Sequence, residues 1–257
     1  MNQRRSTPMR VAALYDIHGN LPALEAVLDE VRQAGVDLLV VGGDVLPGPM
    51  PVECLDALRH LEIPSAYIHG NGEREILAIR GGQEPATVPE QYRPVMEWVA
   101  RQLRPDQAEW IARWPATLTA DVDALGLVCF CHATPQSDTD IFTRLTPEEP
   151  LVSIFASAST PTVICGHTHM PFDRRIGDVR VLNPGSAGMP FGPAGAYWLL
   201  MGDEGVQFRR TAYDLRAAAA RIRATTYPQA DVFADKNVLS PPSDEEMLEL
   251  FTRASRW

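Results

Sequence analysis

The sequence lacks the features of three classes of protein. No stretch approaches the ~20 apolar residues that a membrane-spanning helix needs, and Met1 to Arg10 has arginines without the apolar run of a signal peptide. The four cysteines do not form a secreted disulfide framework. Basic residues number 23 against 33 acidic ones, so the net charge is −10 and a track for nucleic acid phosphates is not expected. We therefore expect a cytoplasmic protein that binds neither membrane nor nucleic acid.

Two of the cysteines, Cys129 and Cys131, lie in the apolar run that ends at Cys131. Alternation along a strand would place both thiols on one face. We interpret them as buried free thiols. A zinc site built on the pair is the alternative, although no second cysteine pair accompanies it.

The first part of the chain alternates between apolar strands and amphipathic helices. Strands are expected over residues 11–15, 38–41 and 65–69, with a helix capped by Asn20 and a second helix over residues 52–61. This order predicts an α/β fold in which helices pack on a parallel sheet. The length of 257 residues suits one domain with a full core.

The remaining chain is helical first and then rich in strands. We predict a single domain over residues 9–226, with a helical insert at about 72–115, and a tail or helix over 227–257 that packs on the domain. Seven strand candidates between residues 118 and 210 predict a mixed or antiparallel sheet. The insert and the tail could shape a substrate pocket or form a contact in a homo-oligomer, and the sequence leaves both open.

Polar side chains that can bind metal ions follow the ends of several predicted strands, which is where open α/β sheets place their sites. They are Asp16, His18, Asp44, Asn71, His132, His167 and His169. A two-residue spacing in extended backbone would place Asp16 and His18 on the same side, and likewise His167 and His169. Asp44 could bridge two ions. Carboxylate with imidazole suits Mn, Fe, Zn, Co or Ni better than Ca or Mg, and we favour Mn.

The same residue types also occur in proteins that bind no metal. A single D-x-H or G-H-x-H pattern arises by chance or as histidines hydrogen-bonded at a strand end. The order, spacing and strand-end position of all seven residues together favour a centre with two divalent metal ions. Of the two remaining histidines, His60 is interpreted as structural. His69 could orient a ligand or pack in the core.

The order of these motifs resembles that of the calcineurin-like metallophosphoesterase superfamily, over roughly Met9 to Leu200. The segments Cys131 to Pro135 and Asn183 to Gly188 are similar to those of its small bacterial and archaeal phosphodiesterases. The resemblance implies a four-layer α/β/β/α sandwich. It also implies two ligand sets: Asp16, His18, Asp44 and His169 for one ion, and Asp44, Asn71, His132 and His167 for the other.

The sequence departs from the family pattern in two places. Gly72 stands where many members carry a histidine that can protonate the leaving group, which favours substrates with good leaving groups or a proton donor from elsewhere in the chain. Pro47 stands where protein phosphatases carry a second aspartate, which argues against that activity. Glu73 matches an acidic family position whose role is open here, and Arg74 could contact phosphate or solvent.

We expect hydrolysis of a small phosphoester, most simply a phosphodiester or nucleotide, by a hydroxide that bridges the two metals. Asp44, His18 and His132 are the residues to which we assign the chemical step. The alternatives are a phosphomonoesterase, a dinucleoside polyphosphate hydrolase, and a non-catalytic metal-binding scaffold on the same fold.

Overall fold

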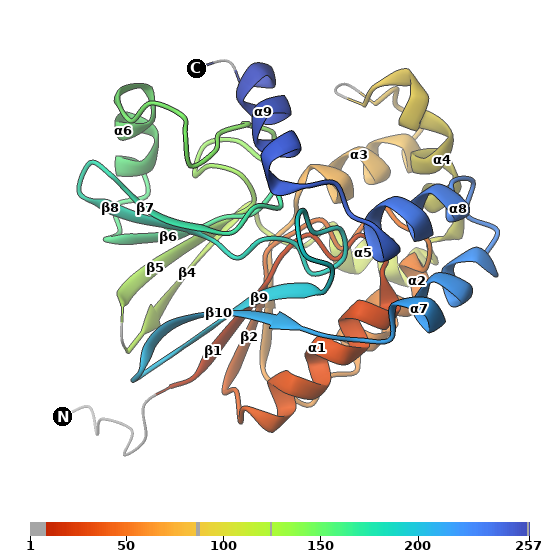
Figure 1. Cartoon of the computed structure of the whole chain (residues 1–257), viewed down its shortest axis with the longest axis horizontal. Coiled ribbons are helices and arrows are strands. Elements are labelled where there is room, and N and C mark those ends of the chain that lie inside the picture. Colours follow the sequence, from red (N-terminus) through yellow and green to blue (C-terminus); the bar gives the residue numbers. More distant parts are fainter. Residues whose placement is uncertain (1–8, 86–87, 124, 256) are drawn as a thin grey trace.

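The structure, a computed structural model, describes residues 9–85, 88–123, 125–255 and 257. Residues 1–8, in which we found no signal-peptide pattern, lie outside this part, as do short pieces of the predicted insert and tail. Within the described residues, ten strands form two mixed sheets of five. Figure 1 shows the two sheets with helices on their outer sides. The first sheet has the order β10-β9-β1-β2-β3. Its strands are β1 (Val11–Leu14), β2 (Leu38–Val41), β3 (Ser65–Tyr67), β9 (Ala196–Gly202) and β10 (Gly205–Thr211).

The second sheet has the order β4-β5-β6-β8-β7. Its strands are β4 (Thr117–Val122), β5 (Gly126–Cys131), β6 (Thr162–Ile164), β7 (Phe172–Ile176) and β8 (Val179–Asn183). β5, β6 and β8 run parallel, whereas β4 and β7 are antiparallel edge strands. The expected mixed sheet is therefore present, but β9 and β10 leave it and pair antiparallel beside β1 instead.

Alternation along the strands builds the layers of the sandwich. In β1, Ala12 and Leu14 join the core beneath the helices, whereas Val11 and Ala13 join the core between the two sheets. In β5, Phe130 faces the same inter-sheet core, while Cys129 and Cys131 face a third core under α6 (Glu149–Ala156). The predicted four-layer α/β/β/α sandwich is confirmed, and the two thiols share a face as expected.

The first two helices of the first sheet's outer layer begin within one residue of the positions that the sequence predicts. α1 (Leu21–Gln33) begins after Asn20, whose side chain accepts a hydrogen bond from the Ala23 amide, and its apolar stripe packs on the sheet. α2 (Pro51–Arg59) follows β2, and α7 (Leu215–Arg223) follows the β9–β10 hairpin. At the right of Figure 1 these helices form one layer.

Two further segments of the described chain are helical. The segment of the predicted insert forms α3 (Asn71–Arg80), the short η1 (Glu90–Tyr92), α4 (Arg93–Gln102) and α5 (Pro105–Ile111). After Tyr227 come α8 (Ala230–Phe233), the π-helix η2 (Ala234–Leu239) and α9 (Asp244–Ala254). The sequence does not predict the π-helix, because the segment around it is rich in proline and aspartate, which favours irregular structure. The domain boundaries themselves stay a prediction. In the described part of the chain, no helix is long and apolar enough to span a membrane.

Candidate metal centre

The seven candidate ligands follow strand ends, and most of them have an unusual backbone. Asp16, His18, Asp44, His167 and His169 all have positive φ, between 47° and 66°. Non-glycine residues rarely adopt this left-handed conformation, and those that do cluster at functional sites. The expected extended backbone at the D-x-H and G-H-x-H motifs is therefore wrong. Tight left-handed turns, rather than strand alternation, bring these side chains together.

The first group of side chains consists of Asp16, His18 and His169, whose ligand atoms all lie within 4.8 Å of one another. Asp16 Oδ1 lies 3.4 Å from His169 Nε2 and 4.0 Å from His18 Nε2, and the two nitrogens are 3.1 Å apart. Donor atoms about 2.1 Å from one ion are themselves roughly 3.0–3.5 Å apart. The group thus has the composition and the spacing of a metal site.

The second group consists of Asp44, His132 and His167. Asp44 Oδ2 lies 3.5 Å from His132 Nε2 and 3.8 Å from His18 Nε2, a member of the first group. This oxygen therefore lies between the two groups. His167 and His169, two residues apart, belong to different groups, as the sequence predicts for a centre with two ions.

Buried polar atoms that make no hydrogen bond support a ligand at this place. Asp16 Oδ1, Asn71 Oδ1 and His132 Nε2 are buried and have no hydrogen bond to any described residue. A buried polar atom without a partner costs about 1–3 kcal/mol. Asn71 is held beside Asp44, because the amide of the next residue, Gly72, donates to Asp44 Oδ1 over 2.8 Å. Cations between these atoms would satisfy all three, so the residues present fit metal ions.

The imidazoles are oriented by backbone carbonyls. Nδ1 of His132 lies 3.0 Å from the Gly42 oxygen, and Nδ1 of His169 lies 2.9 Å from the Met189 oxygen. Nδ1 of His18 lies 3.3 Å from the Pro47 oxygen. When Nδ1–H donates to a carbonyl, Nε2 carries the free lone pair and faces the site, which is the usual arrangement of metal-binding histidines.

The two carboxylates are fixed in the same way, each by one oxygen. The His167 amide donates to Asp16 Oδ2 over 3.0 Å, which leaves Oδ1 facing the histidines. The Gly72 amide donates to Asp44 Oδ1, which leaves Oδ2 facing them. Each acidic residue thus presents one oxygen to the centre and anchors the other on backbone.

The charges of the two candidate groups favour the binding of a cation. Among the described residues, Asp16 and Asp44 are paired with histidines and with no lysine or arginine. Burial lowers the pKa of His18 and of His167 to about 4, so both rings are neutral and can bind a cation. Burial also acts to lower the pKa of His132, but the Asp44 carboxylate outweighs it and raises this pKa to about 10. The proton on His132 thus balances the negative charge of Asp44. A bound divalent cation would supply this positive charge in place of the proton.

Glu73 has a role that the sequence reading left open. It is fully buried, and its carboxylate accepts backbone amides from Gly70, Asp44 and Leu46 at 2.8–2.9 Å. Burial, reinforced by the nearby Asp44 charge, raises its pKa to about 7. Glu73 thereby ties the start of α3 to the loop after β2. The G-x-x-E spacing of a helix start is the sequence signal that could have identified it.

Gly72 cannot be replaced by a larger residue without moving the chain. A Cβ at this position would lie 2.1 Å from the Leu46 carbonyl oxygen and 2.9 Å from Asp44 Oδ1. The position at which many relatives of this pattern carry a histidine is therefore sterically closed here by the loop after β2.

The turn over residues 183–188 is hydrogen-bonded to two of the loops that carry candidate ligands. Asn183 Nδ2 donates to the Gly166 carbonyl over 2.8 Å, in the loop that carries His167. Ser186 Oγ donates to the Asp16 carbonyl over 2.6 Å, and the Gly188 amide donates to the same carbonyl. The turn contacts these loops with backbone and short side chains.

The structure also places His60, which we interpreted as structural, and two residues whose roles were open, His69 and Arg74. His60 follows α2 and is exposed, with Nδ1 2.7 Å from the Asp56 carbonyl, which agrees with a structural role. His69 is half-buried, with Nδ1 4.0 Å from Asp138. Arg74 makes two hydrogen bonds to the Asp138 carboxylate, at 2.7 and 3.0 Å, so it is bound to the protein rather than free.

Two cavities of about 320 Å³ each adjoin the centre. The His18 cavity is lined by His18 and by residues of α4, α8 and η2. The His132 cavity is lined by His132, His69, Arg74 and the 134–138 loop. Each cavity thus has a member of a different metal group in its wall.

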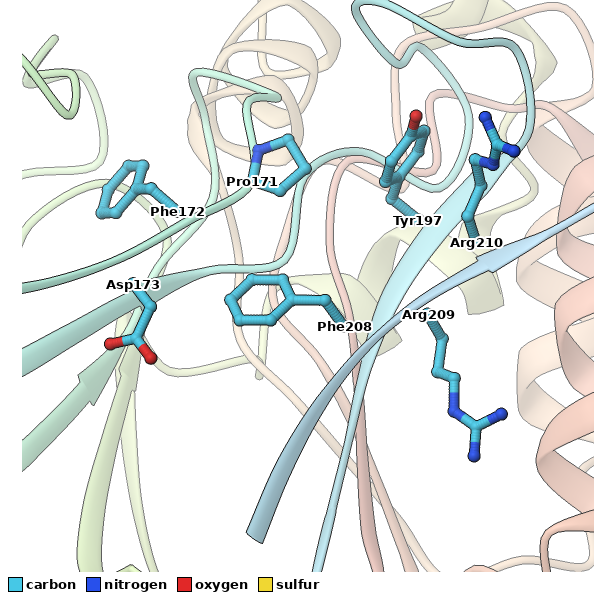
Figure 2. Close-up of a pocket in the computed structure, with 7 residues that line it drawn as sticks. All are labelled: Pro171, Phe172, Asp173, Tyr197, Phe208, Arg209 and Arg210. Atoms are coloured by element: carbon cyan, nitrogen blue, oxygen red, sulfur yellow. The ribbon is translucent and has the colours of Figure 1, made fainter.

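A separate cavity of about 270 Å³ lies between the edge strands of the two sheets. Figure 2 shows Pro171 and Phe172 of the β7 side opposite Phe208 of β10, with Tyr197 of β9 beyond them. The described residues that line it include none of the seven candidate ligands. This cavity is therefore distinct from the metal centre.

Comparison with known proteins agrees with this geometry. Residues 9–204 match the family described as calcineurin-like phosphoesterase superfamily domain, and the chain belongs to this family. The fold is similar to that of a metallophosphoesterase from Sphaerobacter thermophilus, with a TM-score of 0.70 and 24% identity over 91% of this chain and 99% of that one. A hypothetical protein from Pyrococcus horikoshii OT3 is similar with a TM-score of 0.76 and 19% identity, over 91% of this chain and all of that one.

A sequence relative is an uncharacterised protein of Methanocaldococcus jannaschii, which is 24% identical over 85% of this chain and 94% of its own length. The protein described here is thus a phosphoesterase-family member with two candidate metal-binding groups. The family uses divalent metal ions, and the seven residues predicted from the sequence all lie at these groups or, for Asn71, beside Asp44.

Proposed function

We propose that the protein is a phosphodiesterase with two divalent metal ions, and that manganese serves best. One ion would be held by Asp16, His18, Asp44 and His169. The other would be held by Asp44, Asn71, His132 and His167. The observation that carries this proposal is the position of Asp44 Oδ2, 3.5 Å from a histidine of one group and 3.8 Å from a histidine of the other.

Ions bound there would lower the pKa of a water molecule and neutralise charge that builds up on the phosphoryl oxygens. The chain's own contribution is to hold the geometry. The carbonyls of Gly42, Pro47 and Met189 fix three imidazole rings, so that their Nε2 atoms need not reorganise when a substrate enters. Glu73 fixes the backbone at Asp44 and Leu46 and ties it to Gly70 at the start of α3.

The preference for a diester rests on the two cavities beside the centre. A phosphodiester has an organic group on each side of phosphorus, and a monoester has only one. The His18 cavity and the His132 cavity offer two separate places for such groups. With Gly72 closed to a side chain, a histidine cannot protonate the leaving group from that position, which favours leaving groups that depart as stable anions.

The test compares hydrolysis of bis-p-nitrophenyl phosphate with that of p-nitrophenyl phosphate. Metal-stripped protein is assayed with and without added Mn²⁺, and then with Fe²⁺, Zn²⁺, Co²⁺ and Ni²⁺. We expect Mn²⁺-dependent turnover of the diester that exceeds turnover of the monoester. Preference for the monoester would instead support a phosphomonoesterase.

Two alternatives have their own outcomes. Turnover of diadenosine tetraphosphate with little turnover of the simple diester would indicate a dinucleoside polyphosphate hydrolase. Metal binding without turnover of any of the three substrates would favour the non-catalytic scaffold.

A further inference from the structure

The His18 cavity is built from two segments that are far apart in the sequence. Met96 of α4 and Tyr92 form part of one wall, and Tyr227 and Phe233 form part of another. These apolar and aromatic side chains give a slot of about 320 Å³, within the size range of small-molecule sites. Trp98 packs edge-on against Tyr227 at 5.5 Å between ring centroids, and Tyr227 in turn packs against Phe233. The slot therefore has a rigid aromatic base.

The rim of the slot leaves large apolar side chains open to solvent. Tyr92 is 48% exposed and Val232 is 57% exposed, although both line the cavity. Exposed apolar side chains that gather at one concave place mark binding sites more often than isolated ones do. The rim therefore fits a ligand that carries an apolar or aromatic group.

The charge of the cavity is opposite to that of the whole chain. The protein carries a net charge of −10, yet no carboxylate is among the described residues that line this cavity. Its charged residue is Lys236, the only lysine of the sequence, which lies together with Asn237 and Gln229 in the wall. A positive group beside a phosphoester centre favours an anionic ligand.

The acidic neighbours of Lys236 are occupied elsewhere. Asp235 and Asp231 both pair with Arg223, at 2.5 and 3.4 Å. Among the described residues, no carboxylate forms a salt bridge with Lys236. Its ammonium group is thus available to a ligand rather than used in the fold.

Lys236 lies in the π-helix η2. The wide turn is visible in the hydrogen bond from the Ser240 amide to the Asp235 carbonyl, five residues apart, at 2.9 Å. Ala234 and Val238 anchor the turn in the core, while Lys236 is exposed on the cavity side. Single π-turns of this kind occur frequently at functional sites.

We propose that the His18 cavity binds the organic group of the substrate, and that Lys236 binds a second phosphate that this group carries. The substrate class is then a nucleotide-like phosphoester with one phosphate at the metal centre and another at Lys236. This inference rests on the proposed function, because it assumes that the metal centre holds the first phosphate. Lys236 would act as a specificity residue and would not take part in bond cleavage.

The experiment measures binding by calorimetry in Mn²⁺, so it needs no turnover. The two probes are adenosine 3′,5′-bisphosphate and adenosine 5′-monophosphate, which differ by one phosphate. The proteins are wild type, Lys236→Gln, Lys236→Arg and Arg216→Gln. Arg216 is an exposed cation of α7 outside the described lining of the cavity, so its substitution changes the net charge equally.

Wild type is expected to bind the bisphosphate about 10-fold more tightly than the monophosphate, as a charged hydrogen bond allows. Lys236→Gln should abolish this difference, Lys236→Arg should restore most of it, and Arg216→Gln should leave it unchanged. Equal affinity of wild type for both probes would overturn the proposal. An equal loss in Lys236→Gln and Arg216→Gln would also overturn it, because the effect would then be one of net charge.

A failure of the proposed function would look different. If the difference in affinity between the two probes depends on Lys236 but no phosphoester is hydrolysed, the second-phosphate site is supported and the proposed enzymatic function is contradicted. If diesters are hydrolysed and the two probes bind with equal affinity, the proposed enzymatic function is supported and the second-phosphate site is contradicted.

Discussion

The candidate metal centre and the His18 cavity hold their side chains in opposite ways. At the centre, most side chains are buried, and both carboxylates and three of the imidazoles are anchored on backbone, as when Asp16 Oδ2 accepts the His167 amide. In the cavity wall, Lys236 and Val232 are exposed and have no comparable anchors among the described contacts. The difference indicates that chemistry requires a preorganised geometry, whereas recognition requires only surface side chains of suitable character.

The largest effect should come from replacing Asp44, the residue that lies between the two groups. We expect Asp44→Asn to lower Mn²⁺-dependent diesterase activity by more than about 10²-fold, since even residues that only orient a ligand cost 10–100-fold. The variant should also bind fewer manganese ions, as measured by elemental analysis after dialysis. Asp121→Asn on exposed β4 is the matched control, and it should change neither quantity. Full activity in Asp44→Asn would contradict the shared-ligand account.

The backbone scaffold of the centre can be tested through Glu73. Glu73→Ala leaves three buried amides without their acceptor, so the free energy of unfolding should fall by roughly 3 kcal/mol or more. Urea denaturation gives this quantity, and activity should fall in parallel because the Asp44 loop loosens. Glu97→Ala, an exposed glutamate of α4, should change stability by less than about 0.5 kcal/mol. Equal, small losses for the two variants would show that the three amides do not depend on Glu73.

A smaller effect is expected from filling the closed position beside Asn71. Gly72→Ala puts a Cβ against the Leu46 carbonyl, so unfolding should become easier by about 1–3 kcal/mol and activity should decrease. Gly202→Ala is the control, because its Cβ would meet its nearest neighbour at an ordinary 3.4 Å. Gly72→His should not raise activity. A gain in Gly72→His would mean that the loop after β2 moves aside and that the position can supply a proton donor.

The smallest effect concerns the C-terminal helix. Phe191 stacks on the His169 ring at 5.4 Å between centroids, and Phe251 of α9 packs against Phe191 at 5.9 Å. Phe251→Ala should therefore weaken manganese affinity by no more than about 10-fold, through a less constrained His169. Leu250→Ala, whose side chain is exposed on the same helix, should have no effect. If both variants behave as wild type, α9 covers the domain without supporting the centre.

The sequence predicts which residues gather at the candidate centre, because they are short-range signals at strand ends. Asp16, Asp44 and His132 each follow an apolar run whose strand character is evident. β1 and β2 are parallel neighbours, so Asp16 and Asp44 lie at one edge of the first sheet, whereas His132 follows β5 of the second sheet. The backbone at Asp16 and His169 was wrongly expected to be extended, because left-handed turns of non-glycine residues leave no pattern in the sequence.

Other features depended on contacts between distant residues. The return of β9 to the side of β1 was not predicted, since it pairs Val11 with Met201, two residues that are far apart in the sequence. The cavity role of Lys236 depends on a π-helix and on α4, which are more than a hundred residues apart in the sequence. Local propensity alone does not encode such pairings.

The central claim is that two ions occupy the two groups and share Asp44. Crystals soaked in Mn²⁺ and measured for anomalous scattering test it most directly. The account predicts two peaks roughly 3.5–4 Å apart, one beside Asp16, His18 and His169 and one beside Asn71, His132 and His167, with Asp44 between them. A single peak, or two peaks away from Asp44, would contradict it.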